Sequence, residues 1–285
     1  MSAHHDTDGH PGHERAGEAE RAMARLLELD AEVLAPHLEA LTGLIAQAMG
    51  PGAARILDLG SGPGAGSLAL ARRFPAAQVT AVDISPRLLH RLRWQAAAHG
   101  VADRVGTVEA DLDGPWTGFT EKGTFDLIWA AAFMHHVSDP ARAFARAFEH
   151  LRPGGLVAVS EMDFFPCFLP EDTGAGRPGL EARLHHATNT QPPHEWTGAL
   201  ERAGFVVEEH RPFEIRLNTA QAGPALNAYA QVCLAKLRSH ATDVLEADDL
   251  AALDALLDEA QPQSIARRDD LSVRTTRTAW LARRP

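Results

Sequence analysis

A glycine-rich segment, ILDLGSGPGAGSLALA (56–71), carries the strongest chemical signal in the chain. Glycine recurs at every second position from Gly60 to Gly66, shortly after an acidic residue, Asp58. Glycines let the backbone approach a ligand closely, and a helix that starts at such a turn offers unpaired N–H groups. The stretch Gly60–Ala65 also satisfies the dinucleotide pattern G-x-G-x-x-A, so the loop alone leaves two classes of cofactor open.

Two carboxylates follow predicted strands further along the chain. Asp83 ends the run VTAVD, where its carboxylate can accept hydrogen bonds from both hydroxyls of a ribose. Asp111 follows the next strand, where its carboxylate can accept from an adenine amino group while the Leu112 N–H donates to a ring nitrogen. A ribose carboxylate is common to nicotinamide and adenosylmethionine sites. The pair Asp111-Leu112 is therefore the feature that discriminates between the two cofactors.

Two adjacent histidines, His135 and His136, follow the predicted fourth strand. Ligands of open α/β sheets bind outside the carboxyl ends of the strands. An imidazole titrates near neutral pH, so either histidine can take a proton from a hydroxyl, a ring nitrogen or an ammonium group. The alternative is that His135 hydrogen-bonds within the fold and His136 only lines a pocket. Glu161 and Asp163, after the fifth strand, are further candidates.

Short apolar runs alternate with helical patterns through the middle of the chain, as in a parallel sheet that is covered on both faces. Ser85 and Asp139 each precede a proline, which places an N-cap before the first turn of a helix. We therefore predict an α/β fold with a doubly wound, mostly parallel, Rossmann-like sheet of seven strands. The predicted strands are Arg55–Leu59, Gln78–Val82, Val105–Glu109, Phe125–Trp129, Leu156–Ser160, 205–217 and Val273–Ala282, with helices from about Gly64, Pro86 and Pro140.

The first 50 residues divide into a tail and two helices. Residues 1–16 are polar and rich in Gly and His, which predicts a disordered tail. Its histidines lack a fixed geometry that could hold a metal, and we expect no metal site in the chain. Apolar residues at helical spacing predict two helices over 17–50, with Pro36 in the first turn of the second. Residues 51–285 form the main domain.

The composition argues against several kinds of partner. The net charge is -11 and no block of Lys or Arg stands out, which disfavours a nucleic acid. No apolar run approaches the roughly 20 residues of a membrane span, and no secretory signal is evident. Cys167 and Cys233 lack a CxxC partner, which predicts reduced thiols and a cytoplasmic location. No pattern indicates an oligomeric state.

In order and spacing, these elements resemble the class I S-adenosylmethionine-dependent methyltransferases. The resemblance extends from about Arg55 to Asp163 and includes D-x-G-x-G-x-G, the acidic end of the second strand, A-D-L, the histidine pair and L-R-P-G-G. It implies that the chain binds S-adenosylmethionine and releases S-adenosylhomocysteine. The methyl group would pass to a small-molecule acceptor by in-line displacement, because the sulfonium already activates it.

The resemblance also implies roles for individual residues. Asp58 would order the glycine loop and help hold the methionyl ammonium, and Asp83 would bind the ribose. Ile84 would either pack on the adenine or fill the core. The expected cofactor-binding residues are Asp58, Gly60, Ser61, Gly62, Asp83, Ile84, Asp111, Leu112 and Ala130, the last through its backbone.

On the acceptor side, related enzymes often use the second histidine as the base, which favours His136 over His135. The helices of 17–50 and segments at about 164–190 and 219–270 would form a helical cap over the acceptor. The Ala- and Arg-rich composition suggests a role in secondary metabolism. Two rival hypotheses are an NAD(P)-dependent oxidoreductase and a methyltransferase-like domain that binds the cofactor without catalysis.

Overall fold

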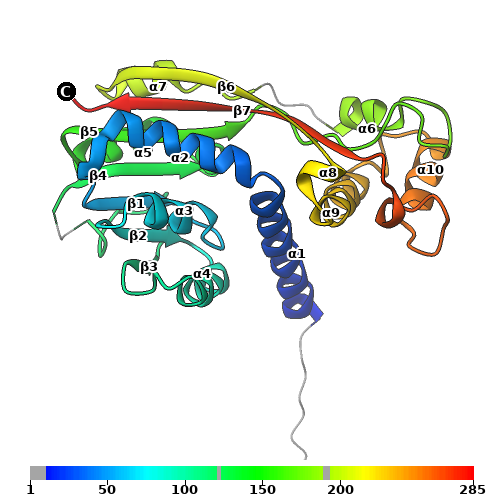
Figure 1. Cartoon of the computed structure of the whole chain (residues 1–285), viewed down its shortest axis with the longest axis horizontal. Coiled ribbons are helices and arrows are strands. Elements are labelled where there is room, and N and C mark those ends of the chain that lie inside the picture. Colours follow the sequence, from blue (N-terminus) through cyan, green and yellow to red (C-terminus); the bar gives the residue numbers. More distant parts are fainter. Residues whose placement is uncertain (1–10, 121–122, 189–192) are drawn as a thin grey trace, which may run out of the picture.

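The computed structural model describes residues 11–120, 123–188 and 193–285. A sheet of seven strands runs through the molecule in the order β3-β2-β1-β4-β5-β7-β6 (Figure 1). The pairs from β3 to β5 are parallel, and β7 is antiparallel to both of its neighbours. The strands are β1 (Arg55–Leu59), β2 (Gln78–Asp83), β3 (Val105–Glu109), β4 (Phe125–Ala131), β5 (Leu151–Met162), β6 (Val206–Asn218) and β7 (Ser272–Arg283). The predicted α/β class and mostly parallel sheet are confirmed.

Helices cover both faces of the sheet because successive side chains of each strand point to opposite sides. Ile56 of β1 packs into a core layer with α2 (Ala35–Met49), α3 (Ala65–Arg73) and α4 (Pro86–Ala98). The next residue, Leu57, enters the opposite layer, which α5 (Pro140–His150) and α7 (Thr197–Arg202) cover. This two-sided burial explains the near-continuous apolar runs of the strands.

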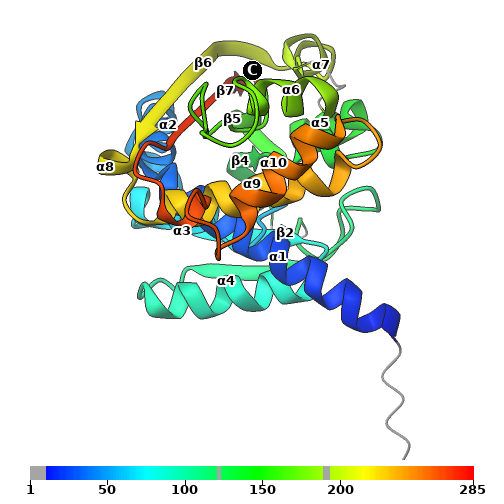
Figure 2. The ribbon, with the colours of Figure 1, turned by 90° about the vertical axis from the view of Figure 1, so that its right-hand side faces the viewer.

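A third apolar cluster forms a separate helical unit, the cap, next to the amino-terminal end of β7. It contains buried residues of α6 (Leu180–Thr188), α9 (Ala225–His240) and α10 (Ala247–Leu257). The short helix α8 (Thr219–Ala222) precedes α9. Helix α1 (Pro11–Val33) contributes Leu29 and Val33 to the cluster, and it lies between the cap and α4 (Figures 1 and 2). Helix α1 therefore links the cap to the sheet domain.

Several expected boundaries differ from those observed. Helix α1 begins at Pro11, so residues 11–16, expected to belong to a disordered tail, are helical; residues 1–10 lie outside the described residues. Strand β5 begins at Leu151, because that residue already pairs with Phe125 before a bulge. The stretch after β6 is broken into three helices, since Gly223 with φ 70° ends α8 and a turn separates α9 from α10.

The two N-caps predicted from the sequence are present in the structure. The side chains of Ser85 and Asp139 accept from the backbone N–H groups of Leu88 and Arg142, as N-cap residues do.

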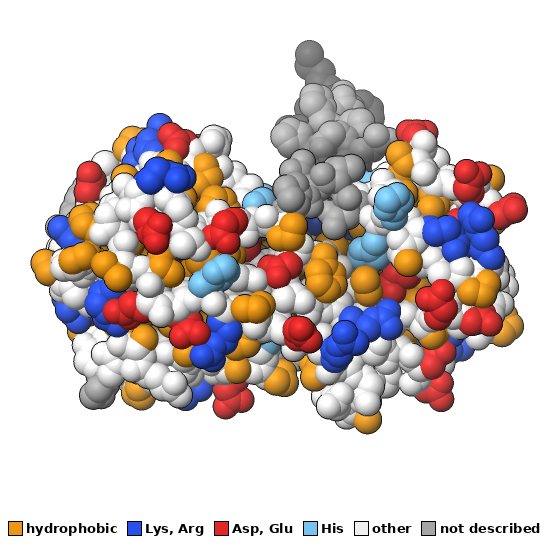
Figure 3. Space-filling view, turned by 90° about the horizontal axis from the view of Figure 1, so that it is seen from above, with side chains coloured by type: hydrophobic (Ala, Val, Ile, Leu, Met, Phe, Trp, Pro, Cys, Tyr) orange, Lys and Arg blue, Asp and Glu red, His pale blue; other side chains and the backbone are white. Residues whose placement is uncertain are grey.

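Acidic, basic and hydrophobic side chains are interspersed over the face shown in Figure 3. None of the helices in the described ranges has the length and apolarity needed to cross a membrane.

Candidate active site

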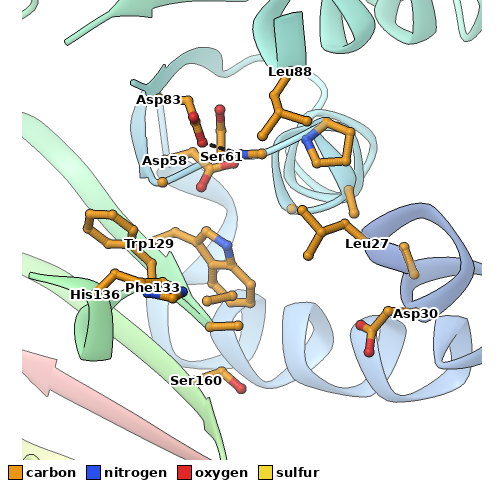
Figure 4. A pocket seen from close by; sticks show the side chains of 18 of the residues that line it. Leu27, Asp30, Asp58, Ser61, Asp83, Leu88, Trp129, Phe133, His136 and Ser160 are labelled. Carbon is orange, nitrogen blue, oxygen red and sulfur yellow. Dashed lines mark hydrogen bonds between the residues drawn. The ribbon is translucent and has the colours of Figure 1, made fainter. Parts of the chain in front are cut away.

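A cavity of about 470 Å³ lies at the carboxyl ends of the parallel strands, between the sheet and helices α1 and α2 (Figure 4). Its size falls within the range of small-molecule sites, which is roughly 300–1,000 Å³. Asp58, Gly62, Asp83 and Asp111 all line it. The cavity therefore brings together carboxylates from the carboxyl ends of three neighbouring strands, at the place where open α/β sheets bind ligands.

The glycine loop turns from β1 into α3 and is tied to the end of β2. The Ser61 N–H donates to the Val82 carbonyl at 3.0 Å, and the Gly62 N–H donates to Asp83 Oδ2 at 2.8 Å. Gly60 and Gly62 have φ of 64° and 53°, a region that side chains disfavour. A Cβ on Gly60 would stand 2.0 Å from the Phe133 ring, so Gly60 lets Phe133 pack against the loop, and Gly60 also lines the cavity. Gly62 lines the open cavity.

Asp83 holds the glycine loop, a role that the resemblance gave to Asp58. Its Oδ2 accepts from Gly62 and its Oδ1 accepts from the Ser85 N–H at 2.9 Å. Each carboxylate oxygen has a second lone pair, so Asp83 can still accept from a ligand. Ile84, the next residue, is 66% exposed and lines the cavity. Core filling by Ile84 is therefore excluded.

Asp58 is almost completely buried and bonds to α3. Its Oδ2 accepts from the Ser67 hydroxyl at 2.5 Å, so the observed contact fixes the start of α3 and not the glycine loop. Burial raises the pKa of Asp58 to about 7, and the nearby charge of Asp83 adds to this effect. A carboxyl group that titrates near neutral pH can change its charge when a cation enters the cavity.

The residues predicted to bind the cofactor lie in the cavity at the carboxyl end of β3 but not at that of β4. Asp111 and Leu112 both line the cavity, and Asp111 is exposed there. Ala130 is buried in β4 and does not line it, whereas Ala131 and Ala132 do. The residues that line the cavity here come one and two positions after the predicted Ala130, because β4 extends to Ala131. Ala132 has φ 49°, which is uncommon for a residue with a side chain and often marks a functional site.

The histidine pair occupies a 3₁₀ turn, η2 (Met134–His136), whose position depends on Glu161. The buried Glu161 accepts from the backbone N–H groups of Phe133 and Met134, at 3.2 and 2.8 Å. Its other oxygen lies 2.7 Å from His135 Nδ1. A carboxylate can only accept, so His135 donates its Nδ1–H in this contact.

Of the two adjacent histidines, His136 lines the cavity, opposite Leu27 and Asp30 (Figure 4). Its ring centroid lies 4.0 Å from that of His135. Burial and the neighbouring His135 lower the pKa of His136, while the charge of Glu161 opposes that shift. His136 is therefore neutral at pH 7 and can accept a proton. Asp163 accepts from the Thr278 hydroxyl at 3.0 Å and does not line the cavity.

Three charged or polar residues of the cavity carry no sequence signal for a site. Asp30 of α1, His37 of α2 and Arg277 of β7 line its far end. Helical periodicity indicates only that α1 and α2 have an apolar face, and Arg277 stands almost 250 residues from Asp30 in the sequence. Among the described residues, no group of three or more His, Cys, Asp or Glu side chains is arranged to hold a metal ion.

Comparison with known proteins points to one family. Residues 56–155 match the model of the methyltransferase domain. The ubiquinone biosynthesis O-methyltransferase of Xanthomonas axonopodis pv. citri (strain 306) is 32% identical over 164 residues, which are 56% of this chain and 65% of that protein. The trans-aconitate 2-methyltransferase of Variovorax paradoxus (strain S110) is 34% identical over 120 residues, 42% and 43% of the two chains. The chain thus spans less than two thirds of the length of these curated relatives.

Solved structures share the fold over most of the chain. The [4+2]-cyclase SpnF has a TM-score of 0.51 at 21% identity and covers 87% of this chain and 81% of its own. The YcgJ protein of Bacillus subtilis has a TM-score of 0.50 at 15% identity, with 87% and 98% covered. The matched domain includes the glycine loop, Asp83 and Asp111 of the cavity. The chain therefore contains a methyltransferase domain over residues 56–155.

Proposed function

We propose that the chain binds S-adenosylmethionine in this cavity and transfers its methyl group to a small-molecule acceptor, releasing S-adenosylhomocysteine. The observation that carries the proposal is the convergence of Gly62, Asp83 and Asp111 on one cavity. The residues fit the cofactor in the order of the strands. Asp111, Leu112 and the exposed Ile84 would hold the adenine and Asp83 the ribose. Asp58 and the backbone of Ala131 would face the amino-acid part.

The chemistry needs alignment and the removal of a proton. When bound, the sulfonium supplies a methyl group that is already activated for in-line displacement. The protein has to hold the acceptor opposite the sulfur and exclude water, and alignment of this kind can contribute several kcal/mol. We assign proton removal to His136, because it lines the cavity and burial keeps its imidazole neutral. Glu161 and His135 position the turn that carries it.

We further infer a cytoplasmic setting from the free thiols of Cys167 and Cys233. Free thiols are typical of proteins in a reducing compartment. The Ala- and Arg-rich composition supports a role in secondary metabolism. Names of the relatives support small-molecule chemistry, since two of them refer to ubiquinone biosynthesis and trans-aconitate.

Loss of the Asp83 carboxylate should weaken cofactor binding. We expect Asp83→Ala to cost about 1–3 kcal/mol of binding free energy for S-adenosylhomocysteine, the range for hydrogen bonds to a charged group. Asp83→Asn keeps an oxygen that can accept from Gly62 and should cost less binding free energy. The two variants together distinguish the loss of a ligand contact from the loss of order in the glycine loop. Calorimetric titration measures both. An unchanged affinity in Asp83→Ala would remove this residue from the site.

Cofactor binding should release a proton from Asp58. With a pKa of about 7, the carboxyl group is about half protonated at pH 7, and a bound cation favours the ionised form. Binding of S-adenosylmethionine should then release up to about half a proton. Calorimetry at pH 7 in buffers with different ionisation enthalpies would reveal it as a buffer-dependent heat. Asp58→Asn should abolish that dependence, and a wild-type heat that is the same in all buffers would contradict the assignment.

A further inference from the structure

The far end of the cavity lies beyond the positions assigned to the cofactor. Neighbouring strands are about 4.8 Å apart, so each step along the strand order moves the lining residue by that distance. From β3 to β7 the lining residues are Asp111, Asp83, Asp58, Ala131, Ser160 and Arg277. The proposed cofactor contacts extend from β3 to β4. The part of the cavity over β5 and β7 therefore remains for the acceptor.

An ion pair between α1 and β7 forms the wall at that end. Arg277 Nη2 donates to Asp30 Oδ1 at 2.5 Å, and the Tyr229 hydroxyl of α9 donates to the same oxygen at 2.5 Å. The side chains of Arg277 and Asp30 are 14% and 19% exposed, and both line the cavity. Tyr229 is buried in the cap and does not line it. The charged pair thus faces the acceptor space from one side and is braced by Tyr229 from the other.

Arg277 donates to its partner carboxylate through fewer guanidinium nitrogens than several other arginines of the chain do. Arg238 and Arg268 each bind their aspartate through both Nε and Nη2, and Arg283 binds Glu208 in the same way. Arg277 binds Asp30 through Nη2 alone, and its buried Nε has no partner within the described part of the chain. Arg277 and Tyr229 both donate to Asp30 Oδ1, so the usual bidentate pairing of a guanidinium with both oxygens of a carboxylate is not formed. Both members of the pair retain hydrogen-bonding capacity.

The pair of Arg277 and Asp30 is electrically neutral, and its neighbour His37 adds no charge at pH 7. Burial, together with the charge of Arg277, lowers the pKa of His37 to about 4, so that imidazole is uncharged at pH 7. Glu161, a further carboxylate that acts on Arg277, already accepts from two backbone N–H groups and contacts His135. An ion of either sign that entered here would face one like charge in a poorly solvated site, which is costly.

We propose that Arg277 and Asp30 recognise an uncharged acceptor group in which a carbonyl oxygen stands beside an N–H or O–H, as in an amide, a lactam or a hydroxyketone. Arg277 donates to the carbonyl oxygen, and the adjacent N–H or O–H donates to Asp30. Such a group matches one donor and one acceptor without adding charge. The proposal rests on the proposed function, because it takes the β3–β4 part of the cavity as the cofactor's place.

Three probes that share one ring and differ in charge test this assignment: benzamide, benzoate and benzylamine. Each is titrated against full-length protein saturated with S-adenosylhomocysteine, with binding followed by saturation-transfer NMR and calorimetry. Benzamide should bind about tenfold or more tightly than either ion, since a mismatched polar group is left unpaired. In the double variant Asp30→Asn with Arg277→Met, which avoids a stranded buried charge, the preference should fall to about threefold or less.

Arg274→Met is the matched control, because Arg274 lies on the same strand, pairs with Glu181 and does not line the cavity. It should retain the wild-type preference for benzamide. If wild-type protein fails to bind S-adenosylhomocysteine, the proposed function falls and this subsite falls with it. If S-adenosylhomocysteine binds but an ion binds best, no probe binds, or the double variant keeps the preference, the subsite assignment alone is overturned.

Discussion

Replacing Gly62 by valine is expected to lower the affinity for S-adenosylhomocysteine about a hundredfold or more, because a branched side chain would occupy the cavity and resist positive φ. Gly62 has φ 53° and lines the cavity, and a Cβ there would already stand 3.5 Å from Leu27 of α1. The added methyl groups of valine therefore have to extend into ligand space or displace α1. Calorimetry measures the loss.

Backbone strain and blocked space can be separated with a second glycine. Gly100 has φ 67°, but a Cβ there would meet no atom within 4 Å, and the residue does not line the cavity. Gly100→Val should lower the melting temperature and leave the affinity for S-adenosylhomocysteine unchanged. If Gly62→Val binds the ligand as tightly as the Gly100 variant does, the glycine loop is not the cofactor site.

Removal of the His136 imidazole should lower turnover by about 10²–10⁴ while sparing cofactor affinity, the range for loss of a general base. The assay uses the best acceptor from a screen with labelled methyl groups. Because the pKa of His136 is lowered, the wild-type rate should rise with pH along a limb that lies below pH 6.5. His136→Ala should lose that limb. A loss of less than about tenfold with an unaltered pH profile would reject His136 as the base.

Glu161 and His135 provide the controls for that experiment. Glu161→Gln should still accept from both backbone N–H groups through its one oxygen, yet it weakens the contact with His135 and removes the charge that supports the protonated form of His136. We expect a smaller loss of turnover than in His136→Ala and a pH limb displaced to lower pH. His135→Ala should mainly lower the melting temperature, because His135 packs between His136 and His194.

The sequence predicts the cofactor end of the site well because its determinants are local. The glycines, Asp83 and Asp111 each follow a strand directly, so correct strand assignment is enough to place them at one edge of the sheet. Small errors arise where an element's length matters. Ala130 was expected in the site, but β4 continues to Ala131, and the turn at Ala132 lines the cavity instead.

The acceptor end depends on contacts between distant segments and could not be predicted. Asp30 appears in the sequence as one polar residue on an amphipathic helix, and Arg277 as part of a terminal strand. They meet only because α1 packs against the cap and β7 is inserted antiparallel between β5 and β6. Likewise, no local pattern indicates that Glu161 holds the turn of His135 and His136.

The most direct test of the central claim is a calorimetric titration of the full chain with S-adenosylhomocysteine and, separately, with NADH. We predict saturable binding of S-adenosylhomocysteine at one site, weakened by Asp83→Ala and prevented by Gly62→Val, with no binding of NADH. Binding of NADH that depends on Asp83, with no heat from S-adenosylhomocysteine, would contradict the proposed cofactor and favour an oxidoreductase.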